Sequence, residues 1–379
     1  MSVAIIDARE WQNLFDLRTG EKTAEDGRLV RMVRGVLARH PYPGDVDRES
    51  NRWVTDTALD LMDKYQPRFV FLSYAQQYFV SRFTPLTETD RKAMLEEVMS
   101  ETDRFIRESG LTSFLMGTGD MTPFRGYIDI SRLDGLGISS NWSARYAGLH
   151  DPTQRDLDFL TTHPRIERVV ERDEWIDLFG YKGPEVERIP QYLLVAEEGW
   201  AFKSPGIPLR KASWLSSRSF SVPYATDLGK VRQLTEIPDL ILTHLEKQPI
   251  ALIVLEGMGL RDFDRPHDLC ANGLEWFYYE PGEGQYLTLT TGEHRIFDYP
   301  PGYRSFDVDG DKKEFPFSGY FKSVPSNTLG ERFAGKNIAV GNRSMLMHMI
   351  PGADISVECF ARNLYNHGTM GVVHRAEKF

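Results

Sequence analysis

The sequence predicts an α/β fold: a mostly parallel sheet flanked by helices, with a β-rich part towards the carboxyl terminus. Two helices, at 55–65 and 91–108, are each followed closely by a short apolar run, at 69–72 and 111–116. Strands that alternate with helices in this way lie parallel and are covered by those helices. After Gln248-Pro249 the chain becomes dense in aromatic residues, glycine and proline, which is typical of short strands and tight turns.

Local signals place the ends of these elements. Pro67 ends the first helix, because proline has no amide hydrogen to continue the ladder of hydrogen bonds. The side chains of residues 87–90 offer caps for the second helix, and Gly110 ends it. The aromatic run at 69–72 is typical of a strand buried on both faces. We expect a polar loop after each strand, and ligands bind beyond the carboxyl ends of parallel strands.

The remaining elements are predicted from shorter patterns. A first strand ends on Asp7, whose carboxylate is either functional or part of a turn. Residues 129–188 are polar and rich in loops, with only short surface helices. A domain boundary at Gln248-Pro249 separates an α/β domain, 1–247, from a β-rich domain, 248–379. Further strands are expected at 3–6, 192–196, 250–255, 338–340, 344–349, 355–359 and 370–373, and further helices around 27–38, 155–160, 173–179 and 235–245.

Composition narrows the classes of partner and compartment. The chain has 379 residues and a net charge of −10, which argues against duplex nucleic acid because that partner needs clustered Lys and Arg. The amino-terminal residues lack the pattern of a signal peptide, and no apolar run is long enough to span a bilayer. The two cysteines make no disulfide framework and fit a reducing compartment. We therefore expect a cytoplasmic protein with no membrane partner.

A resemblance to a known family lies in the central stretch of the chain. The runs that carry it are KYQPRFVFLSYA, TETDRKAMLEEVMSETDRFIRESG and TSFLMGTGDMTPFRGYIDISRL. In pattern and spacing they resemble the alkaline phosphatase superfamily, and most of all its type I phosphodiesterase and nucleotide pyrophosphatase branch. The resemblance covers roughly residues 53–245. It implies an alkaline-phosphatase-like sheet and, as cofactors, two divalent metal ions, zinc or manganese, held by Asp and His.

The chain departs from that family where the metal ligands belong. The first loop with Asp and His corresponds here to residues 73–79, which contain neither an acid nor an imidazole. The family's Asp-His-Gly-Met corresponds to Thr118-Gly119-Asp120-Met121, which keeps one carboxylate and lacks the histidine. Two hard cations close together need several anionic ligands. No metal ligand is therefore assigned, and the cofactor stays unknown.

Candidate site residues come from both parts of the chain. We expect Asp120, Thr118 and Thr122 on the floor of a cleft between the two parts, with arginine and histidines facing them from the carboxyl-terminal part. The predicted catalytic residues are Asp120, His367 and His374, and the predicted substrate-binding residues are Thr118, Thr122, Arg343 and His348.

Other patterns leave alternatives open. The histidines near the carboxyl terminus could form a metal site or a Cys–His pair with Cys359, or simply fill loops around a buried thiol. Residues 307–311 resemble the opening of a calcium loop, but an acidic turn is favoured because Lys312 and Ser318 stand where glycine and glutamate are needed. The aromatic row 276–279 could wall a ligand site or a subunit contact, although core is favoured.

These expectations give two functions of different classes. The first is a small-molecule enzyme that resembles phosphodiesterases and phosphatases and acts on a phosphorylated or other anionic substrate. The second is a non-catalytic, metal-less relative that keeps the scaffold and acts in binding or assembly. A small anionic molecule is the expected partner, no nucleic acid is expected, and assembly into a homo-oligomer stays open.

Overall fold

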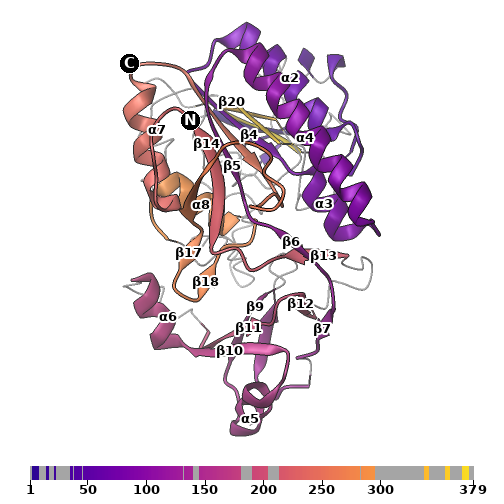
Figure 1. Cartoon of the computed structure of the whole chain (residues 1–379), viewed down its shortest axis with the longest axis vertical. Coiled ribbons are helices and arrows are strands. Elements are labelled where there is room, and N and C mark those ends of the chain that lie inside the picture. Colours follow the sequence, from indigo (N-terminus) through magenta and orange to yellow (C-terminus); the bar gives the residue numbers. More distant parts are fainter. Residues whose placement is uncertain are drawn as a thin grey trace.

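The structure of the chain is a computed structural model with mixed α/β architecture (Figure 1). Its main sheet has helices on both faces, and a smaller sheet lies at one end of the molecule (Figure 1). The residues that it describes are 2–7, 14–16, 21–22, 35–36, 38–44, 46–130, 132–139, 145–180, 190–203, 213–281, 283–294, 337–340, 355–358 and 369–374.

Parallel strands form the centre of the main sheet. Strand β15 (Ile250–Leu255) lies between β5 (Thr112–Gly117) and β4 (Phe69–Tyr74) and is parallel to both. Strands β20 (Ile355–Glu358) and β19 (Asn337–Val340) continue the parallel order beyond β4. The parallel arrangement predicted for 69–72 and 111–116 is therefore confirmed, although another strand separates the two.

Antiparallel strands flank this centre on both sides. Beyond β5 lie β14 (Ser221–Thr226) and then β16 (Asp268–Ala271). Beyond β19 lies β21, which pairs with β1. Strands from near the two ends of the sequence are therefore neighbours in the sheet. In order, the strands on that side are β21 (Thr369–His374), β1 (Ser2–Asp7), β2 (Leu14–Asp16) and β3 (Glu21–Lys22).

The side chains of β15 alternate between two buried layers. Ala251, Ile253 and Leu255 belong to the core beneath α2 (Ser50–Tyr65) and α4 (Glu88–Ser109). The three residues between and before them face the opposite core, beneath α7 (Ile237–Leu245) and α8 (Glu283–Thr291). Figure 1 shows these helix pairs on opposite sides of the sheet. A strand buried on both faces reads as a continuous apolar run, which is why β15 was predictable at its observed bounds.

Capping fixes the start and the end of α4. The hydroxyl of Thr87 accepts a hydrogen bond from the backbone N–H of Asp90 at 3.1 Å, and the carboxylate of Asp90 reaches back to the N–H of Thr87. Gly110 ends the helix in the left-handed region, at φ +64°. Both predicted caps are confirmed, and the helix begins at Glu88, three residues before the predicted start.

The polar loop predicted after the strand at 69–72 is wrong. Residues 76–83 form a helix, α3 (Gln76–Phe83), directly after β4. Tyr78 and Phe79 are both 1% exposed and belong to the core beneath α2 and α4. Burial of these aromatic side chains stabilises a helix of eight residues, which is too short to be stable without tertiary packing.

The prediction of a loop-rich segment at 129–188 with only short helices is also wrong in part, because its described residues contribute three strands to the small sheet. Four antiparallel strands form that sheet, which carries its own apolar core around Leu149, Leu194 and Phe202. The predicted helices at 155–160 and 173–179 are confirmed as α5 (Gln154–Thr162) and α6 (Arg172–Phe179). The strands of the small sheet are, in spatial order, β10 (Ile166–Glu171), β11 (Tyr192–Ala196), β9 (Tyr146–His150) and β8 (Leu136–Ser139).

Two pairs of short strands connect the main sheet to the small sheet along the sequence. These pairs follow β5 and precede β14, so they carry the chain out to the small sheet and back (Figure 1). The paired strands are β6 (Met121–Pro123) with β13 (Trp214–Ser216) and β7 (Gly126–Ile128) with β12 (Trp200–Phe202).

The predicted boundary at Gln248-Pro249 falls directly before β15. Because β15 completes the centre of the main sheet, the residues after the boundary continue the sheet of the amino-terminal part. A tight hairpin ends in the aromatic segment, which was predicted to form short strands and tight turns, but residues 283–291 of that segment form helix α8. The hairpin consists of β17 (Gly273–Leu274) and β18 (Phe277–Tyr278), and a 3-10 turn (Leu234–Glu236) precedes α7.

The row of aromatics at 276–279 is mostly core. Phe277, Tyr278 and Tyr279 are each less than 5% exposed, and Trp276 is half-buried. None of the helices in the described ranges combines the length and the apolar character that crossing a membrane requires.

The carboxylate of Asp156, at the start of α5, binds the backbone before β8 and before α5, and it predicts how stability depends on pH. Burial would raise the pKa of this carboxyl, but the N–H groups of Thr153, Asp134 and Gly135 donate to it at 2.9–3.0 Å and hold its pKa below the ordinary value. Its stabilising effect is therefore present above the unfolded-state pKa of about 4 and is lost as pH falls through the lower folded-state pKa.

We expect Asp156→Asn to lower the free energy of unfolding by roughly 1.5–3 kcal/mol at pH 7, because hydrogen bonds to a charged acceptor are lost. Urea denaturation at pH 7 and pH 3 measures this, and the gap between the variant and the unmodified chain should narrow at pH 3. Asp158→Asn, on the exposed side of α5, is the matched control. An equal gap at both pH values would contradict the prediction.

Candidate functional site

The candidate site lies at the carboxyl edge of the main sheet, where three parallel strands end together. Register brings Tyr74 of β4 and Gly117 of β5 to either side of Leu255 at the end of β15. The residues that follow these positions therefore share one edge of the sheet. Such an edge is the usual place for a ligand in a parallel α/β sheet.

Glu256, directly after β15, is the buried carboxylate at this edge. Its side chain is 0% exposed, and its Oε1 accepts hydrogen bonds from the hydroxyl of Tyr286 at 2.6 Å and of Ser73 at 3.2 Å. The two hydroxyls are themselves 3.0 Å apart. A carboxylate removed from water needs such donors to offset its desolvation.

Gln77 lies at the β4 side of this edge, where its side chain is fully hydrogen-bonded. Its Nε2 donates to the carbonyl oxygens of Tyr74 at 2.6 Å and Glu256 at 2.8 Å, and its Oε1 accepts from Asn51 at 3.0 Å. The residue is 1% exposed. Gln77, in α3, thus bonds to the last residue of β4 and to the first residue after β15, so it links the ends of two neighbouring strands.

Thr118 lies at the β5 side of this edge and bonds to both the loop after β15 and helix α8. Its Oγ1 accepts from the backbone N–H of Gly257 at 2.9 Å, and its carbonyl oxygen accepts from Nε2 of Gln285 at 3.1 Å. The same Nε2 donates to Asn272 at 2.7 Å, whereas Oε1 of Gln285 is buried with no hydrogen-bond partner in the described part of the chain. We call six residues the carboxyl-edge cluster, and each is at most 1% exposed: Ser73, Gln77, Thr118, Glu256, Gln285 and Tyr286.

Asp120 lies beside this cluster and binds the loop after β15. Its Oδ1 accepts from the backbone N–H of Arg261 at 3.1 Å and lies 3.6 Å from Nε of the same arginine. Its own N–H donates to Oγ of Ser219 at 2.9 Å. The residue therefore links two loops. Its side chain is 15% exposed, so most of it is shielded from solvent.

The structure brings together some of the predicted site residues and separates others. Thr118 and Asp120 lie at the same edge, and Thr122 follows in β6, half-buried and paired with Leu215. His374 ends β21, which runs against β19, so its backbone lies at the opposite edge of the sheet. Five strand spacings, about 24 Å, also separate β21 from β5.

The structure therefore does not bring His374 to Asp120. Several other predicted residues lie outside the described residues, and so do two of the patterns noted in the sequence: Arg343, His348, Cys359 and His367, with the segments 307–311 and 344–349.

Cys270 is the cysteine that the structure places, on β16. Its side chain is buried, which with a smaller effect of Glu236 raises the pKa of the thiol to about 12. A thiol with that pKa stays protonated at neutral pH, whereas the thiolate is the nucleophilic form. Cys270 thus has the properties of a small apolar core residue.

The residues at this edge do not fit the pair of metal ions that the resemblance implies. The positions expected to supply ligands carry Gln77 and Thr118, and the polar atoms of both side chains are hydrogen-bonded to neighbouring parts of the chain. Across the described ranges, no group of three or more His, Cys, Asp or Glu side chains could hold a metal ion.

Sequence reasoning missed several buried members of the cluster, Glu256, Gln285 and Tyr286 among them. A signal for Glu256 was present, since an acid directly after a fully apolar strand lies at the carboxyl edge of a sheet. Nothing in the sequence marks Gln285 or Tyr286, because they belong to a helix that the aromatic, glycine-rich context did not predict.

Comparison of the chain with models of protein families gives no match, and comparison with curated proteins gives none either.

Proposed function

We propose that this chain is a non-catalytic, metal-independent protein with an alkaline-phosphatase-like sheet, and that its role is binding rather than ester hydrolysis. The observation that carries the proposal is the carboxyl-edge cluster. A hydrolase of this kind needs its strand ends to present ligands and a nucleophile to a substrate. Here the side chains at those ends are buried and bonded to one another.

The hydrogen bonds of the cluster support this role in detail. Gln77 and Thr118 each bond to the loop after β15, so they stabilise the sheet edge itself. Glu256 is enclosed by two hydroxyl donors and is 0% exposed, which leaves it no contact with solvent. Asp120, the one acid shared with the family pattern, bonds to Arg261.

The test measures metal content and hydrolysis on the full-length chain. We expect less than one equivalent of zinc or manganese per chain after purification in the presence of each metal. We also expect no hydrolysis of bis(p-nitrophenyl) phosphate or p-nitrophenyl phosphate above the uncatalysed rate. Metal analysis by mass spectrometry and release of p-nitrophenolate provide the two readouts.

The competing function, hydrolysis of a phosphorylated substrate, has a distinct signature. It requires two bound metal equivalents and turnover that falls at least tenfold in Asp120→Asn. The matched control is Asp264→Asn, an exposed carboxylate of the loop that also holds Arg261. Turnover lost in the first variant and kept in the second would overturn the proposal.

A further inference from the structure

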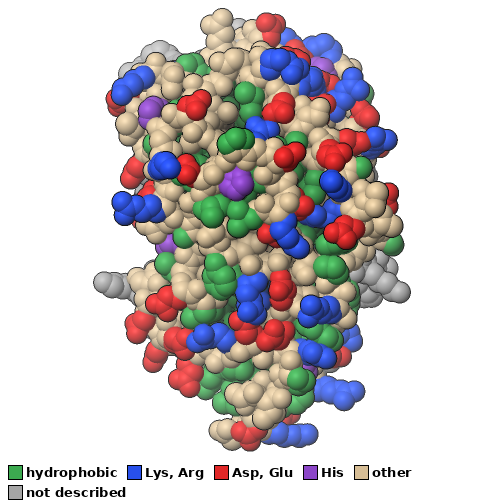
Figure 2. All heavy atoms as spheres, viewed as in Figure 1, with side chains coloured by type: hydrophobic (Ala, Val, Ile, Leu, Met, Phe, Trp, Pro, Cys, Tyr) green, Lys and Arg blue, Asp and Glu red, His purple; other side chains and the backbone are tan. Residues whose placement is uncertain are grey.

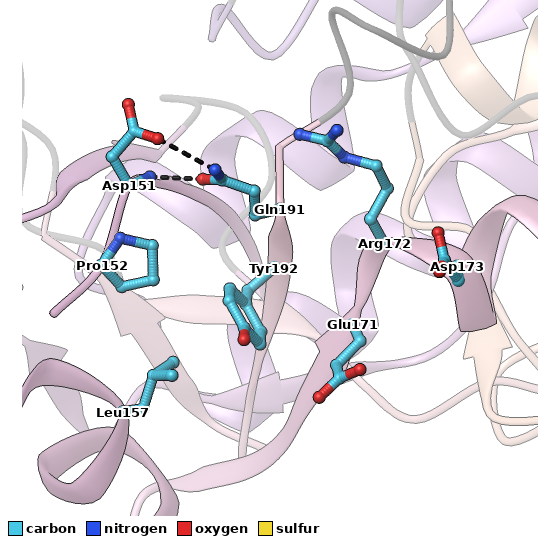
Figure 3. A pocket seen from close by; sticks show the side chains of 8 residues that line it. All are labelled: Asp151, Pro152, Leu157, Glu171, Arg172, Asp173, Gln191 and Tyr192. Atoms are coloured by element: carbon cyan, nitrogen blue, oxygen red, sulfur yellow. Dashed lines mark hydrogen bonds between the residues drawn. The ribbon is translucent and has the colours of Figure 1, made fainter. Parts of the chain in front are cut away.

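A pocket of about 570 Å³ lies in the small sheet, away from the carboxyl-edge cluster. Its volume is that of a small-molecule site. Figure 3 shows the side chains that line it, which come from the turn before α5, from α5 itself, from the end of β10, from the start of α6, and from β11 and the residue before it. The lining residues that matter for the argument are Asp151, Leu157, Glu171, Arg172, Gln191 and Tyr192.

The centre of the pocket is built on a regular part of the sheet. Tyr192 pairs across the strands with Glu171 on one side and with Leu149 on the other. In Figure 3 the ring of Tyr192 lies between Leu157 and Glu171. A half-buried aromatic ring held by two neighbouring strands offers a rigid apolar surface to a ligand.

Hydrogen bonds fix the polar groups at the upper side of the pocket before any ligand arrives. Gln191 Nε2 donates to Oδ1 of Asp151 at 2.9 Å, and the backbone N–H of Asp151 donates to Oε1 of Gln191 (Figure 3). The backbone N–H of Arg172 donates to the carbonyl oxygen of Gln191 at 2.8 Å. Side chains ordered in advance lose less conformational entropy on binding.

The charges of the lining select among ligand classes. Among the described residues of the lining there are three carboxylates and one guanidinium, and Figure 2 shows acidic side chains gathered over the region of α6. That excess of negative charge disfavours a phosphate ligand. The carboxylates do not form a group that could hold a metal ion, and Arg172 stands among them, which disfavours a simple cation.

A neutral polyhydroxylated molecule fits both the charges and the shape. Carboxylate and amide oxygens accept hydrogen bonds from hydroxyl groups, and guanidinium and amide nitrogens donate to them. Tyr192 and Leu157 supply apolar surface for the C–H face of a ring. We propose that this pocket binds a saccharide of one or two rings, with Arg172 and Glu171 as its main hydrogen-bonding residues and Tyr192 beneath the ring.

This inference rests on the proposed binding role and names its ligand class. The experiment titrates the full-length chain with glucose, galactose, N-acetylglucosamine and maltose, followed by saturation-transfer NMR and calorimetry. Spermidine and inorganic phosphate are titrated in parallel. We expect at least one saccharide to bind with a Kd of about 1 mM or tighter, and neither ion to compete with it.

Variants locate the site. Arg172→Ala and the conservative Glu171→Gln should each weaken saccharide binding roughly tenfold, whereas Arg155→Ala, an exposed arginine of α5 outside the lining, should leave the Kd unchanged. Circular dichroism verifies that each variant is folded, and Glu171→Gln keeps the test valid should Arg172→Ala unfold α6.

Three results would overturn the inference: no saccharide binding at ~10 mM, binding that both lining variants leave unchanged, or displacement of the saccharide by spermidine or phosphate. None of these affects the hydrolysis assays. Conversely, metal-dependent hydrolysis without saccharide binding would refute both proposals, and saccharide binding with hydrolysis would refute only the first.

Discussion

Replacing Glu256 by alanine should lower the free energy of unfolding by roughly 3–5 kcal/mol. The substitution removes the acceptor of two buried hydroxyls, those of Ser73 and Tyr286, and leaves a cavity at the end of the central strand. Both effects act on a site with 0% exposure, where water cannot replace the lost contacts without cost. Urea denaturation followed by tryptophan fluorescence measures the change.

Glu256→Gln is the matched control for this substitution. The amide keeps an acceptor oxygen and nearly the same volume, so the expected loss is only roughly 1–2 kcal/mol. A smaller loss for alanine than for glutamine would show that the carboxylate is not held by the hydroxyls in the way described.

Gly117→Ala should strongly destabilise the carboxyl edge, with a loss of about 3 kcal/mol in the free energy of unfolding. A Cβ at this position would lie 2.2 Å from the carbonyl oxygen of Met258. That oxygen cannot easily move, because it accepts the backbone N–H groups of Thr118 at 3.0 Å and Gly119 at 3.2 Å. The loop after β15 would have to shift as a unit.

The control for this prediction is Gly35→Ala. Among the described residues, the neighbour near a Cβ there is the flexible end of Arg39, at 3.5 Å, so this change should leave the urea midpoint nearly unaltered. Equal midpoints for Gly117→Ala and the unmodified chain would contradict the close approach of β5 to the loop after β15.

Strong local signals made a large part of the fold predictable. The apolar run of β15 and the caps of α4 are dictated by neighbouring residues, and the structure confirms both. Strand β11 of the small sheet was predicted at its observed bounds, but β8, β9 and β10 were not predicted, because they are short and their stabilising contacts come from distant residues. The pairing of Tyr192 with Leu149, for example, leaves no trace in local sequence.

The candidate site was predictable only in part, for a related reason. Thr118 and Asp120 follow a recognisable strand, so their place at the carboxyl edge could be deduced. The contacts of the edge, such as Ser73 with Glu256 at a separation of 183 residues, depend on which strand is inserted between β4 and β5. That insertion is a property of the topology, which a single sequence does not reveal.

The late position of β15 in the chain has a consequence during synthesis. On a ribosome, β4 and β5 emerge long before the strand that separates them, so each must wait with an open hydrogen-bonding edge and apolar side chains uncovered. The nascent chain passes through a stage in which its core is incomplete and prone to self-association. The gap between β4 and β5 can be filled only after residue 255 has left the exit tunnel, and the other edge of β4 stays open until β20 follows.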